Sequence, residues 1–123
     1  MQYLLLIYDQ EAQFEGMPEK EQLAIFQEYV ALVEELKERK VYLGGNPLKP
    51  TSTAATVRVR KGKRGVTDGP FAETKEQLGG YFLVDVKNLD EALEIAARIP
   101  TARDGSIEVR PIQPMGRAQG AAE

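Results

Sequence analysis

The residues best able to do chemistry are concentrated in one polar segment, residues 67–78, which reads TDGPFAETKEQL. Asp68 stands directly before Gly69 and Pro70. One interpretation is structural: the Asp68 side chain closes an Asx-turn, Gly69 takes positive φ and Phe71 enters the core. The other interpretation is functional, with the carboxylate available to a ligand. The sequence keeps both open.

The residue types that are absent narrow the chemistry further. The chain contains no cysteine and no histidine. Thiolate nucleophiles, disulfides and cysteine-based metal sites are excluded, and so is the usual general base near neutral pH. Acid–base chemistry would have to use Asp, Glu, Lys or Tyr. Glu73 and Lys75 either keep an exposed turn soluble or contact a ligand. No carboxylate spacing indicates a metal, and no cofactor is predicted.

Length and charge set the broad class of protein. A chain of 123 residues fits one domain. We predict a domain over residues 1–113 and a disordered tail over residues 114–123, which are rich in Gly, Ala and Gln. The net charge of −3 argues against direct binding to nucleic acid or to an anionic membrane. The first residues lack the basic start of a signal peptide, and no apolar run approaches the roughly 20 residues of a membrane span, so we predict a cytoplasmic protein.

One cluster of basic residues contrasts with the net negative charge of the chain. Residues 58–64 contain five cations, which form either a solvated hairpin tip or a small basic patch. These are Arg58, Arg60, Lys61, Lys63 and Arg64.

The elements that must position these residues follow from the hydrophobic pattern. Residues 3–8 and 81–86 are almost continuously apolar, which indicates two strands covered on both faces. Alternating residues 55–60 and 107–110 indicate half-buried strands, the first entering a hairpin that returns at 66–67. A short strand over 41–43 ends in a turn at 44–47.

Two helices complete the pattern. Residues 18–40 have acidic residues in the first turn, basic residues in the last and two apolar rows, one with Leu23 and Phe26 and one with Tyr29 and Leu36. Residues 88–99 begin with a capping box at Asn88 and end before a proline.

The order is therefore strand, helix, strand, hairpin insert, strand, helix, strand. This predicts an α+β fold, ferredoxin-like βαββαβ with an inserted hairpin, in which the two continuously apolar strands are central. Two helices cover only one face of such a sheet. We therefore predict a homodimer in which the other faces pack against each other.

The sequence also resembles a known family. The block TDGPFAETKEQLGGYFLVDV, with QYLLLIY, TVRVR, NLDEALEIAARIP and SIEVRPI, is similar to the YCII-related family and to its DGPF-domain branch. The resemblance extends to about Met115 and implies a dimeric α/β-barrel protein. It also implies an association with extracytoplasmic-function sigma factors.

The resemblance implies candidate site residues as well. Other branches carry a His and Asp pair in a pocket; this chain has no histidine, so only the acid can correspond, and Asp68 is the candidate catalytic residue. In dimeric α/β barrels, pockets lie beside the sheet or at the barrel mouth, where strand ends and the insert loop supply the lining. The candidate ligand-binding residues are Tyr8, Asp9, Glu73, Lys75 and Tyr81.

Three functions remain open at this point. The first is a binding or regulatory module that holds a small molecule or meets a protein partner such as a sigma factor. The second is an enzyme, isomerase- or lyase-like, that transfers a proton through Asp68 with Lys75 or a tyrosine stabilising negative charge. The third is a dimer that has lost its chemistry together with the histidine.

Overall fold

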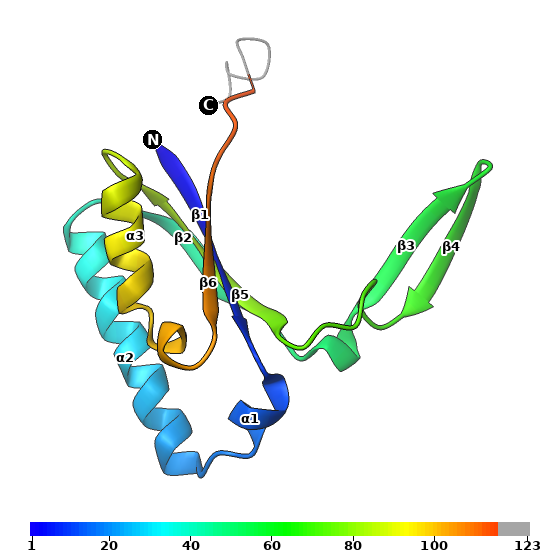
Figure 1. Ribbon diagram of the computed structural model, residues 1–123, viewed down its shortest axis with the longest axis horizontal. Helices are drawn as coiled ribbons and strands as arrows, with labels where there is room; N and C mark the ends of the chain where they lie inside the picture. The colour runs from blue at the N-terminus through cyan, green and yellow to red at the C-terminus, as the bar shows by residue number, and fades with distance from the viewer. Residues whose placement is uncertain (116–123) are drawn as a thin grey trace.

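The computed structural model describes residues 1–115, so the predicted tail over 114–123 lies almost entirely outside the described residues (Figure 1). The main sheet consists of β1 (Gln2–Asp9), β2 (Tyr42–Pro47), β5 (Gln77–Asp85) and β6 (Ser106–Pro111). The helical elements are α1 (Glu11–Glu15), α2 (Glu19–Glu38), α3 (Leu89–Arg98) and the 3-10 turns η1 (Thr51–Thr53) and η2 (Pro100–Arg103). A separate two-stranded hairpin is formed by β3 (Ala55–Arg60) and β4 (Lys63–Asp68).

The main sheet is antiparallel in the order β2-β5-β1-β6. This is the strand order of the ferredoxin-like fold, so the predicted α+β class is confirmed. The two continuously apolar segments are the central strands β1 and β5, and the alternating segment near residue 109 is the edge strand β6, both as predicted.

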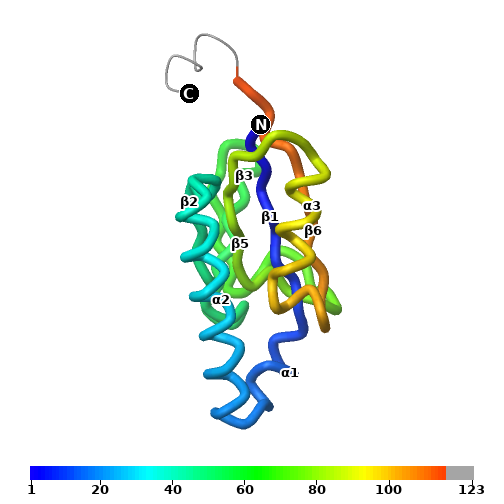
Figure 2. Tube along the Cα trace, turned by 90° about the vertical axis from the view of Figure 1, so that its left-hand side faces the viewer, coloured from blue at the N-terminus to red at the C-terminus, as the bar shows by residue number. Residues whose placement is uncertain are grey.

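Helices α2 and α3 lie side by side over one face of the sheet (Figures 1 and 2). Leu36 and Ile95, one from each helix, are completely buried against the β1 residue Leu5 and the β5 residue Val84. The α3 cap is also confirmed, because the Glu91 amide donates a 3.0 Å hydrogen bond to Oδ1 of Asn88. Burial of this face fixes the positions of both helices.

Several predicted boundaries were wrong. Residues 44–47 continue strand β2 because β5 pairs with them, and residues 11–15 form a short helix that was not predicted. The hairpin returns from Lys63 through a tight turn in which Lys61 and Gly62 both have positive φ, so β4 is longer than predicted. Phe71 does not enter the core: its side chain is 78% exposed.

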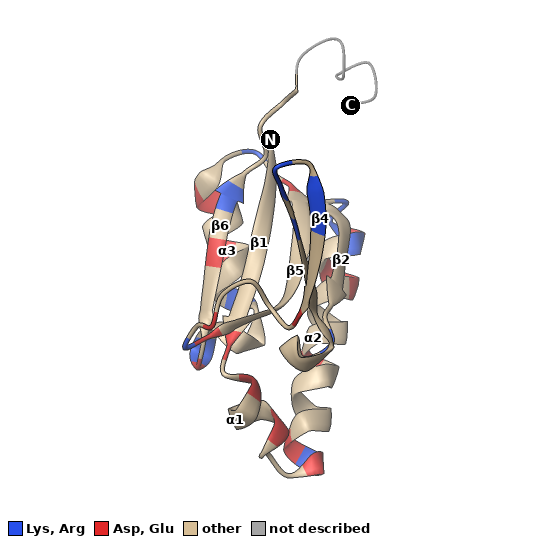
Figure 3. Ribbon diagram, turned by 90° about the vertical axis from the view of Figure 1, so that its right-hand side faces the viewer, with Lys and Arg blue, Asp and Glu red and all other residues tan. Residues whose placement is uncertain are grey.

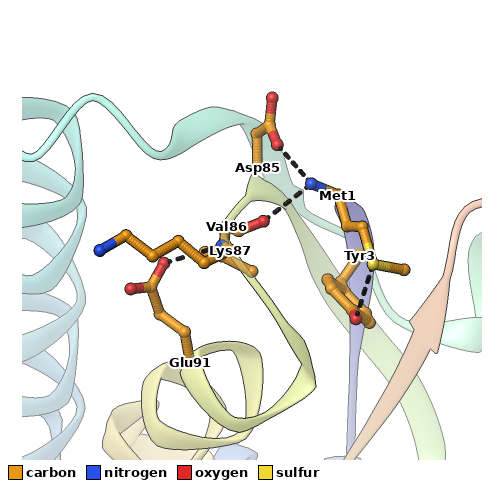
Figure 4. Close-up of polar contacts among 6 residues, drawn as sticks. All are labelled: Met1, Tyr3, Asp85, Val86, Lys87 and Glu91. Carbon is orange, nitrogen blue, oxygen red and sulfur yellow. Dashed lines mark hydrogen bonds and ion pairs between the residues drawn. The ribbon is translucent and has the colours of Figure 1, made fainter.

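The opposite end of the sheet from α1 is closed by the first residue (Figure 4). The amino group of Met1 donates hydrogen bonds to Oδ1 of Asp85 at 3.1 Å and to the carbonyl of Val86 at 2.8 Å. Beside them, the Lys87 amide donates to Oε1 of Glu91 at 3.2 Å. These bonds join the start of β1 to the connection between β5 and α3.

No helix of residues 1–115 lies on the other face of the sheet, and the β3–β4 hairpin projects from that side (Figures 1 and 3). We call this hairpin the arm. Its cations lie toward its far end, as Figure 3 shows in blue. None of the helices in residues 1–115 is long and apolar enough to cross a membrane.

Candidate functional site

A cavity of about 720 Å³ lies between the helical layer and the sheet, and we call it the α2 cavity. The first half of α2 extends beyond the sheet toward α1, so the two helices bracket this space (Figure 2). The floor comes from β1, β2 and β5, and η2 closes one side. The residues used below are Asp9, Tyr29, Tyr42, Gly79, Gly80, Phe82 and Thr101, all of which line the cavity.

Two glycines on the cavity floor leave space that side chains would otherwise fill. A Cβ atom on Gly80 would lie 3.0 Å from the carbonyl oxygen of Asn46 on the paired strand, which leaves no room for a side chain without a shift. A Cβ on Gly79 would lie 3.5 Å from Oδ1 of Asp9, an ordinary contact. The Asp9 carboxylate therefore lies beside a position that has no side chain to cover it.

Asp9 is the acidic group at this floor whose pKa the fold raises. It ends β1, on the same side of the sheet as the buried residue Ile7. Within residues 1–115 its carboxylate has no hydrogen-bond or ion-pair partner. Partial burial raises the pKa of Asp9 above 3.8, and the nearby carboxylates of Glu11 and Glu76 raise the pKa further. A carboxyl group with a raised pKa is better matched to proton transfer near neutral pH.

Aromatic rings from α2, β2 and β5 also line the cavity. Phe82 makes edge-to-face contacts with Tyr29, at 6.2 Å between centroids, and with Tyr42, at 5.7 Å. The hydroxyl of Tyr29 shares a 2.5 Å hydrogen bond with Oγ1 of Thr101. Burial raises the pKa of both tyrosines above 10.0, so both hydroxyls are neutral at physiological pH and can donate hydrogen bonds.

Two charged groups at the rim have structural partners. The Glu11 carboxylate accepts hydrogen bonds from the Thr51 amide at 2.9 Å and the Thr51 hydroxyl at 3.0 Å, which joins α1 to the base of the arm. Arg103 forms a two-fold hydrogen-bonded pair with Glu28 at 2.9 and 3.0 Å, joining η2 to α2. Both side chains therefore hold the walls of the cavity in position, and neither is assigned to ligand binding.

The structure separates the residues that the sequence grouped. Of the candidate ligand-binding residues, Asp9 lines the α2 cavity. Tyr8 and Tyr81 do not; they lie on the face without helices, where the Tyr81 hydroxyl accepts a 3.0 Å hydrogen bond from Nδ2 of Asn46. Glu73 and Lys75 are exposed in the loop before β5.

Asp68, the candidate catalytic residue, lies at the end of the arm strand β4 and does not line the α2 cavity. Its carboxylate makes no hydrogen bond within the described chain, so the Asx-turn interpretation is wrong. The positive φ of Gly69, 92°, is confirmed. The turn is instead held by the Gly69 amide, which donates to the Ala54 carbonyl at 2.7 Å, and by the Thr56 hydroxyl, which donates to the Gly69 carbonyl at 2.8 Å.

Sequence reasoning missed Tyr29 and Thr101. Tyr29 was placed in an apolar row of the helix, and Thr101 follows the proline that ends α3. A hydroxyl on an otherwise apolar helix face was the available signal, since buried tyrosine hydroxyls need a partner. Residues 1–115 contain no group of three acidic residues able to hold a metal ion.

Comparison with known proteins identifies a family and similar proteins. The profile of the YCII-related domain matches residues 1–116. An uncharacterized protein from Rhizobium meliloti (strain 1021) is 39% identical over 114 residues, which cover 91% of this chain and 92% of that protein.

Among solved structures, this chain is similar to a 5-chloro-2-hydroxyhydroquinone dehydrochlorinase from Burkholderia phenoliruptrix in complex with 2,5-dihydroxybenzoquinone. It superposes with a TM-score of 0.55 and 15% sequence identity, covering 92% of this chain and 94% of that chain. At this identity the likeness shows a shared fold.

Proposed function

This chain belongs to the YCII-related family, and on that basis we propose that it binds a small, mainly apolar molecule in the α2 cavity. Asp9 is the polar group that orients the ligand. The observation that carries this proposal is a carboxylate with a raised pKa and no partner in the described chain, on the floor of a cavity with aromatic walls. Apolar cavities of roughly 300–1,000 Å³ with a few polar groups are typical ligand sites.

The preferred ligand is a single-ring molecule with a hydroxyl or other weakly acidic donor. Tyr29, Tyr42 and Phe82 supply ring edges and faces for stacking, and Asp9 accepts the donated hydrogen. A solved protein of the same fold contains a bound single-ring compound, 2,5-dihydroxybenzoquinone. That compound is of a size that a cavity of about 720 Å³ admits.

A small-molecule enzyme is the alternative function, and the raised pKa of Asp9 favours it. In this version Asp9 takes a proton from the bound ligand and either returns it at another atom of the ligand, as in an isomerase, or gives it to a leaving group whose bond to the ligand breaks, as in a lyase. A neutral tyrosine hydroxyl donates to the developing negative charge. Asp68 as the acid or base stays a prediction; it requires a ligand to reach the arm, since Asp68 does not line the cavity.

Hydroquinone is a suitable probe because it is a neutral ring with two hydroxyl donors. Binding is followed by NMR through the backbone amides of Gly79 and Gly80 on the cavity floor, with Gly62 on the arm as the internal control. We expect Asp9→Asn to weaken binding about tenfold, because a hydrogen bond to a charged acceptor is lost. Asp68→Asn should leave binding unchanged. Equal loss in both variants, or no shifts at the two floor glycines, would contradict the assignment.

We also infer a homodimer in which the sheet faces without helices meet. The supporting observation is that Leu4, Leu6 and Leu83 point to this face, which no described element covers in one chain. A molecular mass of one chain by light scattering at micromolar concentration would contradict it.

An extracytoplasmic-function sigma factor as a partner stays a prediction from the family resemblance. It is tested by mixing this protein with purified sigma factors from the same genome at micromolar concentrations. No complex by gel filtration would count against it.

A further inference from the structure

One face of the arm is mainly apolar and has no partner within residues 1–115. Val57 and Val66 are cross-strand partners, and Val59 lies two residues along β3, so these three side chains share a face, which Arg64 joins as the cross-strand partner of Val59. The three valines are 58%, 55% and 59% exposed. We call this surface the valine face. Three β-branched apolar side chains on one side of a ribbon are the pattern of a face that packs against protein.

The reverse face of the arm carries charged side chains that favour exposure to solvent. Arg58, Arg60 and Lys63 alternate with the valines and so point away from the valine face. The contrast between the two faces indicates that one is covered and the other solvated. A two-stranded ribbon alone is marginally stable in water, so it gains order when its apolar face is covered.

The arm and the open face of the main sheet are on the same side of the molecule (Figures 1 and 3). The sheet carries Leu4, Leu6 and Leu83 toward this side, and Leu43 on β2 is exposed. A single protein that docks on this side therefore meets both apolar surfaces.

The surface areas of the sheet face and the arm favour a second copy of this chain as the docking partner. Four strands of six to nine residues offer a flat area of roughly 400–500 Å², at about 4.8 Å per strand and about 3.3 Å per residue. A stable interface buries about 800 Å² on each partner. The valine face adds roughly 200 Å² by the same measure, and in a two-fold dimer each copy also receives the partner's arm.

The distribution of charge also favours a second copy of this chain as the partner. The chain carries 19 acidic and 16 basic residues, and five of the basic residues are on the arm. The rest of the molecule is therefore markedly acidic. The basic arm is attracted to a second copy of the same chain, whose body has the opposite charge.

We propose that the arm is a dimerisation arm whose valine face packs on a second copy while the open sheet faces meet. This rests on the proposed homodimer but adds a contact that the sheets do not require. Asp68 is the cross-strand partner of Ala55 and lies at the foot of the valine face. The acid of the DGPF segment thus belongs to the interface between copies.

The test compares two neighbouring residues that point to opposite faces of the arm. Val66→Asp puts a charge on the valine face, and Thr67→Asp puts the same charge on the reverse face of the same strand. Dissociation constants of the full chain are measured by sedimentation equilibrium. We expect Val66→Asp to weaken the dimer at least about 100-fold, because each copy buries a carboxylate among apolar side chains, and Thr67→Asp to change it less than about threefold.

A third variant, Leu83→Asp, reports on the sheet face alone. If Leu83→Asp dissociates the dimer and Val66→Asp does not, the homodimer stands and the arm contact is overturned. A monomeric wild-type chain overturns both. Equal weakening by Val66→Asp and Thr67→Asp would assign the effect to charge on the ribbon and would also overturn the arm contact. Circular dichroism on each variant checks that the main sheet is retained.

Discussion

The hydroxyl of Tyr29 lies 2.5 Å from Oγ1 of Thr101, so a single hydrogen bond joins the middle of α2 to the η2 turn across one end of the α2 cavity. The next residue back along α2, Glu28, pairs with Arg103 of the same turn. Two successive residues of one helix therefore fix the distance between two cavity walls.

Loss of the Tyr29 hydroxyl should loosen this wall. We expect Tyr29→Phe to lower the free energy of unfolding by about 1 kcal/mol, since the Thr101 hydroxyl loses its partner. Thr101→Val should cost a similar amount, and the double variant should cost less than the two together. Urea denaturation measures all three. Strict additivity would contradict the hydrogen bond as a coupled pair.

A methyl group beside Asp9 should obstruct the ligand. Gly79→Ala places a Cβ 3.5 Å from Oδ1 of Asp9, whereas Gly44→Ala places a Cβ with no atom within 4 Å. We expect Gly79→Ala to weaken hydroquinone binding about tenfold and Gly44→Ala to leave it unchanged. Similar affinities in both variants would mean that the ligand lies away from Asp9.

The pKa of Asp9 is raised in the folded chain, which sets the sign of a pH effect. From 3.8 up to the raised pKa the folded state binds more protons at Asp9 than the unfolded state, so stability falls as pH rises through this window. Asp9→Asn removes this dependence. We therefore expect the variant to gain stability relative to wild type between acid and neutral pH, measured by urea denaturation at a series of pH values.

Substitution of Glu76 tests whether a nearby negative charge raises the pKa of Asp9. Its charge raises the pKa of Asp9, so Glu76→Gln should move the titration of Asp9 to lower pH in carboxyl NMR. Glu73→Gln, on the same loop but absent from the causes of the shift, is the control. Equal movement in both variants would point to net charge instead of proximity.

The two apolar rows of α2 should differ sharply in their contribution to stability. Leu36 is completely buried, whereas Leu23 is 54% exposed. We expect Leu36→Ala to lower the free energy of unfolding by about 3 kcal/mol and Leu23→Ala to change it by less than about 0.5 kcal/mol. A large loss in Leu23→Ala would indicate that this row is covered in solution.

Much of the fold could be predicted because its signals are local. The apolar runs of β1 and β5 identify central strands, and Asn88 with Glu91 identifies the start of α3. The residues around Gly44 were predicted as a turn because their types favour turns. Pairing of Gly45 with Phe82 on β5 extends the strand instead, since sheet pairing overrides a weak local preference.

The candidate site could be predicted only in part. Asp9 was placed at the end of a strand correctly, but its neighbour Tyr8 points to the other face. Strand alternation separates the two residues, and only the position of the helices decides which face forms a cavity. Asp68 was a candidate because it stands in the polar segment 67–78, yet the arm places it away from the α2 cavity.

The sequence by itself determined the fold family, the central strands and the exclusion of histidine and cysteine chemistry, because composition and hydrophobic period are properties of the chain alone. Only the tertiary structure decided which acid is perturbed. The pKa of Asp9 depends on burial and on Glu76, 67 positions away in the sequence, and its access depends on Gly79. Electrostatic fields and cavities act through space, so no local pattern around residue 9 could have revealed them.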